Sequence, residues 1–455
     1  MQLTLSQLEH HFFDAIKILP SKTNAFEFKE HIFGMMFLKR ISDMSEDHYN
    51  TSVFDVPEYA QWSYIRDDLH INIGDGLNQA LHVLEEANKD IFEGVFQHID
   101  FNYRVGHSCL TDQQFRDLII HFDRYHLSDE DFEFPGVFGY VYQRLVARFA
   151  NLAGNKSSEL CTPLEITQLM ARLVKPQSGQ RIYDPCVGSG GMLVQSLQYV
   201  RETEDEDAAR NMSFYGQENN DSVWSTCKMS MILHGVLDAD IRKGDTLVEP
   251  KHLDDNGNLL QYDCVLSNPP FNQSYTQKGL IFPERFQHGF TPEKGKKANL
   301  MFAQHMLAVL RQPTGVMVTV MPRGVLFRGG VEQMIRKGFV ESDVLEAVID
   351  LPLNMFDGTG IPACILVMRA PDGKSLERQD KVLFIDASTE YHVDSDYAKN
   401  YLLSEHIEKI VSAYDDFKDI PGFATVVSHD LLEANDYNFN TSCYVDISHS
   451  SNDRD

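Results

Sequence analysis

The sequence lacks the features that mark secreted, membrane-spanning and zinc-ribbon proteins. Its seven cysteines are an odd number, and no two of them form a C-x-x-C pair. A zinc ribbon and a disulfide framework are therefore not expected, and a reducing compartment fits. The opening residues, MQLTLSQLEHHFF, show no basic stretch before a long apolar run, so we expect no secretory signal. No run reaches the roughly 18 apolar residues of a membrane helix, which predicts a soluble cytoplasmic protein with no membrane partner.

Positive charge is also scarce. There are 40 Lys and Arg against 67 Asp and Glu, which gives a formal net charge of −27. A small basic protein that coats DNA is excluded, because such binding depends on many Lys and Arg side chains. Any contact with nucleic acid requires a local basic surface or a more basic partner. The content of 43% hydrophobic and 24% charged residues is ordinary for a globular protein and excludes a fibrous or disordered chain.

The apolar pattern predicts three regions. Residues 1–150 should be helical, because apolar positions such as Ile32 and Met36 recur at helical spacing. Residues 151–390 alternate between short apolar runs and amphipathic helices. Residues 391–455 should form a short helical segment and a polar tail, with no further strands.

Seven apolar runs in the middle region have the length of buried strands. Their alternation with helices predicts an α/β fold, a mostly parallel, doubly wound sheet covered on both faces. One of these helices should carry a single apolar stripe, formed by Ala303, Met306, Leu307 and Leu310. The expected strands are Arg181–Asp184, Phe214–Tyr215, Tyr262–Ser267, Val316–Met321, Leu345–Asp350, Cys364–Arg369 and Val382–Asp386.

A glycine-rich turn follows the first expected strand. From Asp184 to Gly191 it reads DPCVGSGG, and a helical pattern comes next. Glycines let the backbone approach a ligand closely, and a helix N-terminus offers free N–H groups at the positive end of its dipole. The turn therefore suits a nucleotide-like ligand, although it could also serve only as a tight turn. The G-x-G-x-x-G fingerprint fits badly, because its third glycine would fall at Leu193.

Two acidic residues follow later strand positions. Glu218 closes the segment FYGQE, and an ionised carboxylate there can accept hydrogen bonds from both hydroxyls of a ribose. A strand-end glutamate can equally be a surface or cap residue. Asp245, in the turn GDTL, could accept from an adenine amino group. An aspartate that only caps its own turn is an equally good interpretation of Asp245.

The most specific motif is Asn268-Pro269-Pro270-Phe271, directly after the apolar run that ends at Ser267. The prolines remove two N–H donors and stiffen the loop. The Asn268 oxygen and a proline carbonyl remain as acceptors, and Phe271 adds a flat apolar face. These groups suit the exocyclic amine of a planar base, although such a turn can also be purely structural. All four motifs fall at strand-to-helix transitions, so we expect them to line one edge of the sheet.

The glycine turn and the Asn-Pro-Pro-Phe motif resemble those of class I, S-adenosylmethionine-dependent DNA adenine-N6 methyltransferases. More narrowly, the chain resembles the modification (M) subunit of type I restriction–modification systems. The narrower resemblance rests on FKEHIFGMMFLKRISD at 28–43, ELCTP at 159–163, PRGVLFRGG at 322–330 and GTGIPAC at 358–364. It covers about residues 10–420. It implies a Rossmann-like catalytic domain at 151–390, preceded by a helical domain that contacts partners or DNA.

The resemblance also implies roles for individual residues. The expected contacts of the cofactor, S-adenosyl-L-methionine, are Glu159, Leu160, Cys161, Thr162, Pro163, Leu164, Asp184, Gly188, Ser189, Gly190, Gly191, Glu218 and Asp245. Asn268, Pro269, Pro270 and Phe271 would hold the target adenine. Cys161 stands where the family commonly has an aromatic residue, and Cys186 where small residues are usual. Neither change removes a polar role, so we expect an active site, and no group of residues has metal-ligand spacing.

Double-stranded DNA is the implied substrate. The resemblance implies that a specificity (S) subunit selects the sequence, that two M subunits join one S subunit, and that restriction (R) subunits can add to them. The acidic charge supports such a partnership. Two alternatives stay open, namely a self-sufficient adenine methyltransferase that reads its own site and a non-catalytic scaffold that only binds the cofactor or a partner.

Overall fold

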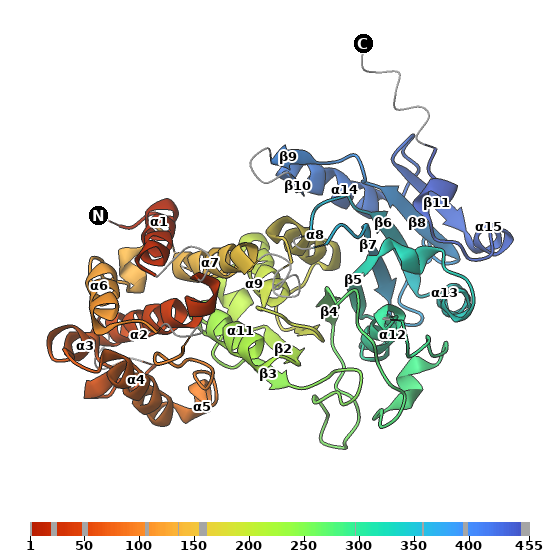
Figure 1. The fold of residues 1–455 in the computed structure, drawn as a ribbon. Coiled ribbons are helices and arrows are strands. Elements are labelled where there is room, and N and C mark those ends of the chain that lie inside the picture. Colours follow the sequence, from red (N-terminus) through yellow and green to blue (C-terminus); the bar gives the residue numbers. More distant parts are fainter. Residues whose placement is uncertain are drawn as a thin grey trace, which may run out of the picture. The chain divides into compact units, whose positions relative to one another are not determined.

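Figure 1 shows the computed structural model of the chain. It describes residues 2–19, 25–47, 53–104, 109–134, 136–153, 162–295, 297–356, 359–394 and 399–446. Contacts between residues divide the chain into two compact units. The first unit comprises Met1–Cys161 and Asp221–Asp238, and the second comprises Thr162–Asn220 and Ala239–Asp455. Within the described ranges, no helix is both long enough and apolar enough to cross a membrane.

The first unit is helical, as the apolar spacing predicts. Its helices are α1 (Leu5–Ala15), α2 (Lys29–Asp47), α3 (Trp62–Asp67), α4 (Ile73–Ala87), α5 (Lys89–Phe92), α6 (Asp112–Phe122), α7 (Val137–Ala153) and α11 (Asp221–Leu233). Every residue of α2 from 31 to 43 is buried. Burial is tolerable there because Lys39 pairs with Asp43 at 2.6 Å and Arg40 pairs with Asp129.

The second unit is built on a nine-stranded sheet in the order β11-β8-β6-β7-β5-β4-β1-β2-β3. Strands β3, β2, β1, β4 and β5 are parallel, whereas β7 runs antiparallel between β5 and β6. At the other end, β11 pairs antiparallel with β8, and β9 (His392–Asp394) pairs with β10 (Lys399–Tyr401) outside this sheet. The sheet strands are β1 (Arg181–Asp184), β2 (Ser213–Glu218), β3 (Asp240–Lys243), β4 (Cys264–Ser267), β5 (Val316–Pro322), β6 (Leu345–Asp350), β7 (Ala363–Arg369), β8 (Lys381–Asp386) and β11 (Ala424–Ser428).

The predicted α/β architecture is confirmed, and each of the seven expected strands is present. The prediction that strands end near residue 390 is wrong, because β9, β10 and β11 follow it. These strands and β3 have three to five residues each. Both β3 and β11 lie at the ends of the sheet and are only partly buried, so neither shows an unbroken apolar run.

The remaining helices belong to the second unit. They are α8 (Leu164–Val174), α9 (Gly191–Thr203), α10 (Glu206–Arg210), α12 (Asn299–Ala308), α13 (Val331–Glu341), α14 (Ser404–Asp416) and α15 (His429–Ala434). The prediction of a single apolar stripe on α12 is wrong, since every residue from Asn299 to Leu307 is buried. The helix is covered from two directions, by strand β5 and by the short 3-10 helix Pro283–Phe286.

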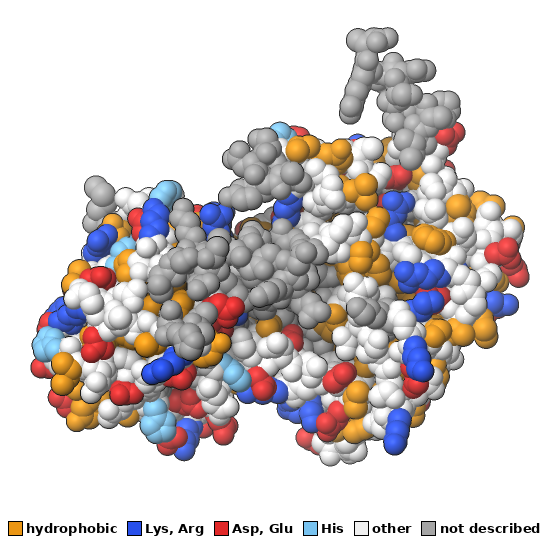
Figure 2. All heavy atoms as spheres, in the orientation of Figure 1, with side chains coloured by type: hydrophobic (Ala, Val, Ile, Leu, Met, Phe, Trp, Pro, Cys, Tyr) orange, Lys and Arg blue, Asp and Glu red, His pale blue; other side chains and the backbone are white. Residues whose placement is uncertain are grey.

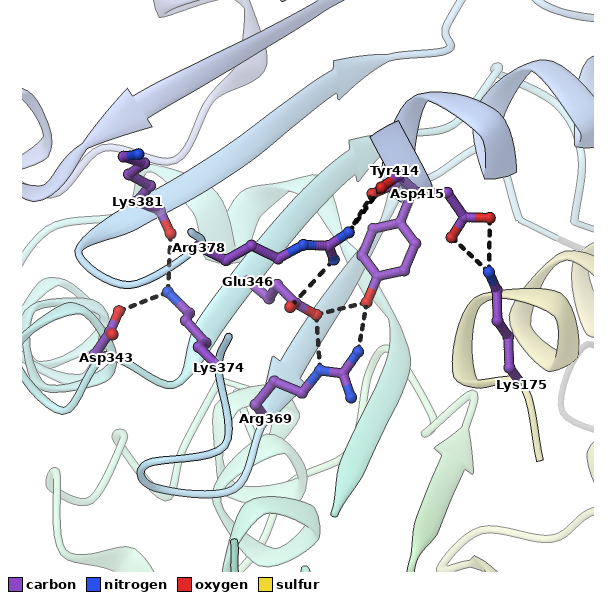
Figure 3. Close-up of polar contacts among 9 residues, drawn as sticks. All are labelled: Lys175, Asp343, Glu346, Arg369, Lys374, Arg378, Lys381, Tyr414 and Asp415. Atoms are coloured by element: carbon purple, nitrogen blue, oxygen red, sulfur yellow. Dashed lines mark hydrogen bonds and ion pairs between the residues drawn. The ribbon is translucent and has the colours of Figure 1, made fainter. Parts of the chain in front are cut away.

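A buried ionic cluster joins α14 to the amino end of β6 (Figure 3). Glu346 is 1% exposed and accepts hydrogen bonds from Arg369 Nε at 2.8 Å and from Tyr414 Oη at 2.5 Å. Arg378 donates to its other oxygen at 3.3 Å. Burial alone would raise the pKa of Glu346, but the charge of Arg369 and the hydrogen bonds from Tyr414 and Arg369 lower it overall. The carboxylate therefore stays ionised and holds both arginines.

Candidate active site

The candidate site lies where the strand order of the sheet reverses. From β1 the order runs through β2 to β3 on one side, and through β4 to β5 on the other. In an open α/β sheet, such a reversal leaves a crevice beyond the carboxyl ends of the strands, where ligands bind. The glycine turn follows β1 and Asn268 follows β4, so both flank this point. Glu218 is the last residue of β2, and Asp245 follows β3, the next parallel strand.

Asp184 links the glycine turn to the strand that carries Asn268. It is the last residue of β1 and is 1% exposed. Its Oδ1 accepts hydrogen bonds from Ser267 Oγ at 2.6 Å and from the Cys186 backbone N–H at 2.9 Å. Because Ser267 immediately precedes Asn268, this one carboxylate helps to set the spacing of the two loops. A direct contact of Asp184 with the cofactor stays a prediction.

Asp184 also makes stability depend on pH. Burial raises its pKa to about 7, from an ordinary value of 3.8. A carboxyl group with a raised folded-state pKa stabilises the fold while protonated, and this contribution is lost as the pH rises from about 4 to about 7. Asp184→Asn keeps the acceptor oxygen but cannot ionise. From about pH 4 to about pH 7, the unfolding temperature of the variant should therefore rise relative to wild type, and above about pH 7 the difference should level off.

Differential scanning calorimetry of both proteins across this pH range measures that effect. Subtracting the two profiles removes the titration of groups that they share. A difference in unfolding temperature that does not change with pH would show that the Asp184 carboxyl group has an ordinary pKa.

The turn after β1 requires glycine at two positions. Gly188 and Gly190 have φ angles of 55° and 88°, in the left-handed region that other residues adopt at a cost. Gly190 precedes α9, which begins at Gly191 and has no side-chain cap. Buried Ser189 lies between the two left-handed glycines. An uncapped helix start behind a glycine turn is an arrangement that binds anionic or polar ligands through backbone N–H groups.

Glu218 lies beside the glycine turn. Its Oε2 accepts a hydrogen bond from the Gly188 backbone N–H at 3.1 Å, and its Oε1 accepts from that of Asn220 at 2.8 Å. The half-buried carboxylate of Glu218 is therefore held against the turn, and its contact with ribose hydroxyls stays a prediction.

Asp245 caps its own turn. Its Oδ1 accepts hydrogen bonds from the next backbone N–H groups, those of Leu247 at 2.9 Å and Val248 at 3.2 Å. These bonds support the turn-capping interpretation of this residue. A contact between Asp245 and an adenine stays a prediction.

The Asn268 side chain is held on one side and unsatisfied on the other. Its Nδ2 donates to Thr162 Oγ1 at 3.0 Å, which fixes the orientation of the amide. Its Oδ1 is buried and has no hydrogen-bond partner in the described part of the chain. A buried acceptor without a partner costs about 1–3 kcal/mol, so this atom is suited to accept a hydrogen bond from a ligand donor such as an exocyclic amine.

An aromatic pair stands next to this acceptor. The ring of Phe271 lies edge-to-face with that of Phe356, with centroids 5.8 Å apart. Phe356 follows β6, and both rings are half-buried. No sequence motif marked Phe356. Its place in the run LPLNMF, directly after an apolar strand, was the signal available. Pro269, between the amide and this pair, is buried, and Pro270 is half-buried.

Arg285 is a second residue that no motif marked. It is 3% exposed, and its pKa is lowered by burial to about 10, so it stays charged at neutral pH. It donates hydrogen bonds to Nδ1 of His305 and to the backbone oxygens of Thr246, Leu247, Ile281 and Phe282. These contacts join the Asp245 turn to the segment that follows Phe271 and to α12.

Three of the expected cofactor residues, Glu159, Leu160 and Cys161, lie outside the described residues. Thr162 contacts Asn268, as described above. Pro163 is the N-cap residue of α8, and Leu164, the first residue of that helix, is 39% exposed.

Comparisons with known proteins agree with this geometry. The HsdM N-terminal domain model matches residues 8–122, and the N-6 DNA Methylase model matches residues 134–453. The chain belongs to the N-6 DNA methylase family. This confirms the family that its motifs indicated.

Relatives of this methylase include type I restriction enzyme subunits. The MjaVIII methylase subunit of Methanocaldococcus jannaschii is 34% identical over 84% of this chain and 65% of that protein. The MpnII methylase subunit of Mycoplasma pneumoniae is 31% identical over 82% of this chain and 69% of that protein. The methylase thus spans about two thirds of the length of these curated relatives.

A solved structure is similar over nearly the whole methylase. The type I restriction-modification system methyltransferase subunit from Streptococcus thermophilus superimposes with a TM-score of 0.83 at 26% identity. The match covers 98% of this chain and 100% of that chain. Both the helical unit and the sheet unit therefore have counterparts in that protein.

Proposed function

We propose that the chain is the methyltransferase subunit of a type I restriction–modification enzyme. It transfers a methyl group from S-adenosylmethionine to N6 of adenine in double-stranded DNA. The observation that carries this proposal is Oδ1 of Asn268, which is buried and has no hydrogen-bond partner among the described residues. It lies at the carboxyl end of β4, where the strand order of the sheet reverses. Family membership supports the same reaction.

The residues beside the reversal of strand order fit S-adenosylmethionine, whose sulfonium supplies an electrophilic methyl group when bound. The left-handed glycines at 188 and 190 let the backbone approach a ligand closely, and α9 begins without a side-chain cap. We assign Gly188–Gly191 to the polar end of the cofactor, Glu218 to its ribose hydroxyls and the Asp245 turn to its adenine. We also assign to residues 159–164 the contacts with the cofactor that the family resemblance implies.

The target amine lies inside the base stack, so the adenine must leave the duplex. Extrusion costs a few kcal/mol. Stacking on an aromatic side chain such as Phe271 offsets roughly 1–3 kcal/mol of this. Phe356 supports the Phe271 ring from the side.

The amine is a weak nucleophile, because its lone pair is conjugated with the purine ring. Hydrogen bonds from its two protons to Asn268 Oδ1 and to the Pro269 carbonyl favour a pyramidal nitrogen, whose lone pair can point at the methyl group. Thr162 keeps the amide oriented so that Oδ1 is the atom presented. One proton leaves the nitrogen after transfer, so no strong base is needed. The protein contributes positioning and electrostatics.

Sequence specificity and much of the DNA affinity come from an S subunit. The net charge of −27 opposes binding to phosphates. On the face shown in Figure 2, Lys and Arg side chains stand among Asp and Glu instead of forming one basic surface. We assign two of these chains to one S subunit, with R subunits added for restriction, in the cytoplasm.

Modified-base sequencing tests this proposal. DNA from cells that express the chain with its S subunit should carry N6-methyladenine at one sequence motif, and DNA from cells that express the chain alone should not. N6-methyladenine made by the chain alone would favour a self-sufficient enzyme. No methylation in either culture would favour a non-catalytic scaffold.

A further inference from the structure

Phe327 stands exposed at the sheet edge that carries the candidate site. It follows β5 and the 3-10 helix Arg323–Leu326, and it is 53% exposed, whereas Leu326 before it is 1% exposed. Strand β5 pairs in parallel with β4, so the loops that follow these strands share one edge. A Cβ added at Gly329 or Gly330 would meet nothing within 4 Å. The backbone at these two glycines is therefore not covered by neighbouring side chains within this distance.

Two cations lie around Glu332, close to Phe327 in the chain or in the fold: Arg328 is the next residue, and Lys297 shares Glu332 with Arg328. The Arg328 guanidinium lies over Gly324, where an added Cβ would stand 2.4 Å from it. Arg328 lies 3.7 Å from one oxygen of Glu332, and Lys297 lies 3.8 Å from the other. The cationic side chains are 40% and 39% exposed, whereas that of Glu332 is 4% exposed. Lys297 is close to the Asn268 motif, because the next residue, Ala298, donates a backbone hydrogen bond to Gln273 at 3.1 Å.

Glu332 explains why the two cations lie together. It sits in the first turn of α13, and neither of its oxygens has a hydrogen-bond partner among the residues described. A buried carboxylate needs compensating charge, and Arg328 and Lys297 supply it from just beyond hydrogen-bond reach. At these distances the attraction is electrostatic, which leaves the exposed ammonium and guanidinium groups suited to bind phosphate oxygens.

We propose that the loop after β5 enters the DNA duplex at the extruded adenine, with Phe327 filling the vacated space and Arg328 and Lys297 binding the flanking phosphates. This rests on the proposed function, which requires extrusion. Proteins that distort DNA commonly insert apolar side chains between base steps. Leu353, on the loop after β6, is also exposed (49%), but it has neither a flat ring to stack on bases nor a cation beside it in sequence.

The test uses the complex with its S subunit and a duplex of the sequence that it methylates. Phe327→Ala should lower the methylation rate about tenfold, which corresponds to the stacking of one base. On a duplex with a mismatch opposite the target, where the adenine is already poorly stacked, most of this loss should disappear. Phe327→Trp, which keeps a stacking ring, should retain activity.

Extrusion is also measured without methyl transfer. The target adenine is replaced by 2-aminopurine, whose fluorescence rises when it leaves the stack, and the complex is saturated with S-adenosylhomocysteine. Phe327→Ala should lower this signal. Leu376→Ala is the matched control, since Leu376 is 86% exposed on the turn between β7 and β8 at the opposite edge of the sheet.

Equal fluorescence from Phe327→Ala and wild type, or an equal loss of rate on matched and mismatched duplexes, would overturn the inference. Failure of the wild-type complex to methylate any sequence would instead overturn the proposed function, on which this inference rests.

Discussion

Asn268→Ala should lower the rate of methyl transfer about 10²–10³-fold, the usual effect of removing one preorganised hydrogen-bonding group from an active site. The variant lacks the Oδ1 acceptor that has no partner within the described structure. Its affinity for S-adenosylmethionine should change little, because the substitution leaves Gly188–Gly191, Glu218 and the Asp245 turn unaltered. Single-turnover methylation and isothermal calorimetry measure the two quantities separately.

Two further variants sharpen this experiment. Asn268→Asp keeps an acceptor oxygen but loses the N–H donor to Thr162, so its rate should fall between those of wild type and Asn268→Ala. Asn256→Ala removes an exposed asparagine from a turn elsewhere and should keep the wild-type rate. An Asn268→Ala rate within about twofold of wild type would show that this side chain does not activate the amine.

Glu346→Ala should destabilise the second unit by about 3–5 kcal/mol, because it leaves Arg369 and Arg378 partly buried without their counter-charge. The cluster drawn in Figure 3 connects β6, β7 and α14 through this carboxylate. Because the pKa of Glu346 is lowered, its contribution to stability is present above the unfolded-state value of 4.5 and is lost as the pH falls through the folded-state value. Urea denaturation followed by circular dichroism at neutral pH measures the effect.

Glu405→Ala is the matched control. Its side chain is 76% exposed in the first turn of α14, the helix that carries Tyr414. Its loss should therefore change the free energy of unfolding by less than about 1 kcal/mol. Equal effects of the two substitutions would show that the buried cluster adds no more stability than a surface charge.

Much of the sheet could be predicted, because its central strands are buried on both faces. All seven residues of β5 and all six of β6 are buried, which requires apolar runs that the sequence displays. Strands β3 and β11 lie at the ends of the sheet, where burial is partial and apolar runs are broken. A single apolar stripe on α12 predicts one exposed face, but the polar residues Asn299, Gln304 and His305 are buried as well.

The candidate site also has parts that the sequence predicts and parts that it does not. The glycine turn and the Asn268 motif are local, because glycine and proline act on their own backbone. The links that position them are not local. Asp184 contacts Ser267, 83 residues away, and Asn268 contacts Thr162, 106 residues away. Such pairs depend on the order of the strands in the sheet, which cannot be read from a single sequence. The same holds for the contact of Phe356 with Phe271 and for the positions of Arg328 and Lys297 around Glu332.

The central claim is tested most directly by a structure of the complex with its S subunit, a duplex of the methylated sequence and an analogue of S-adenosylmethionine that cannot transfer a methyl group. The account predicts the analogue at Gly188–Gly191 and Glu218, with N6 of an extruded adenine within about 3.2 Å of Asn268 Oδ1. An analogue bound elsewhere, or an adenine held by other side chains while Oδ1 stays unpartnered, would contradict it.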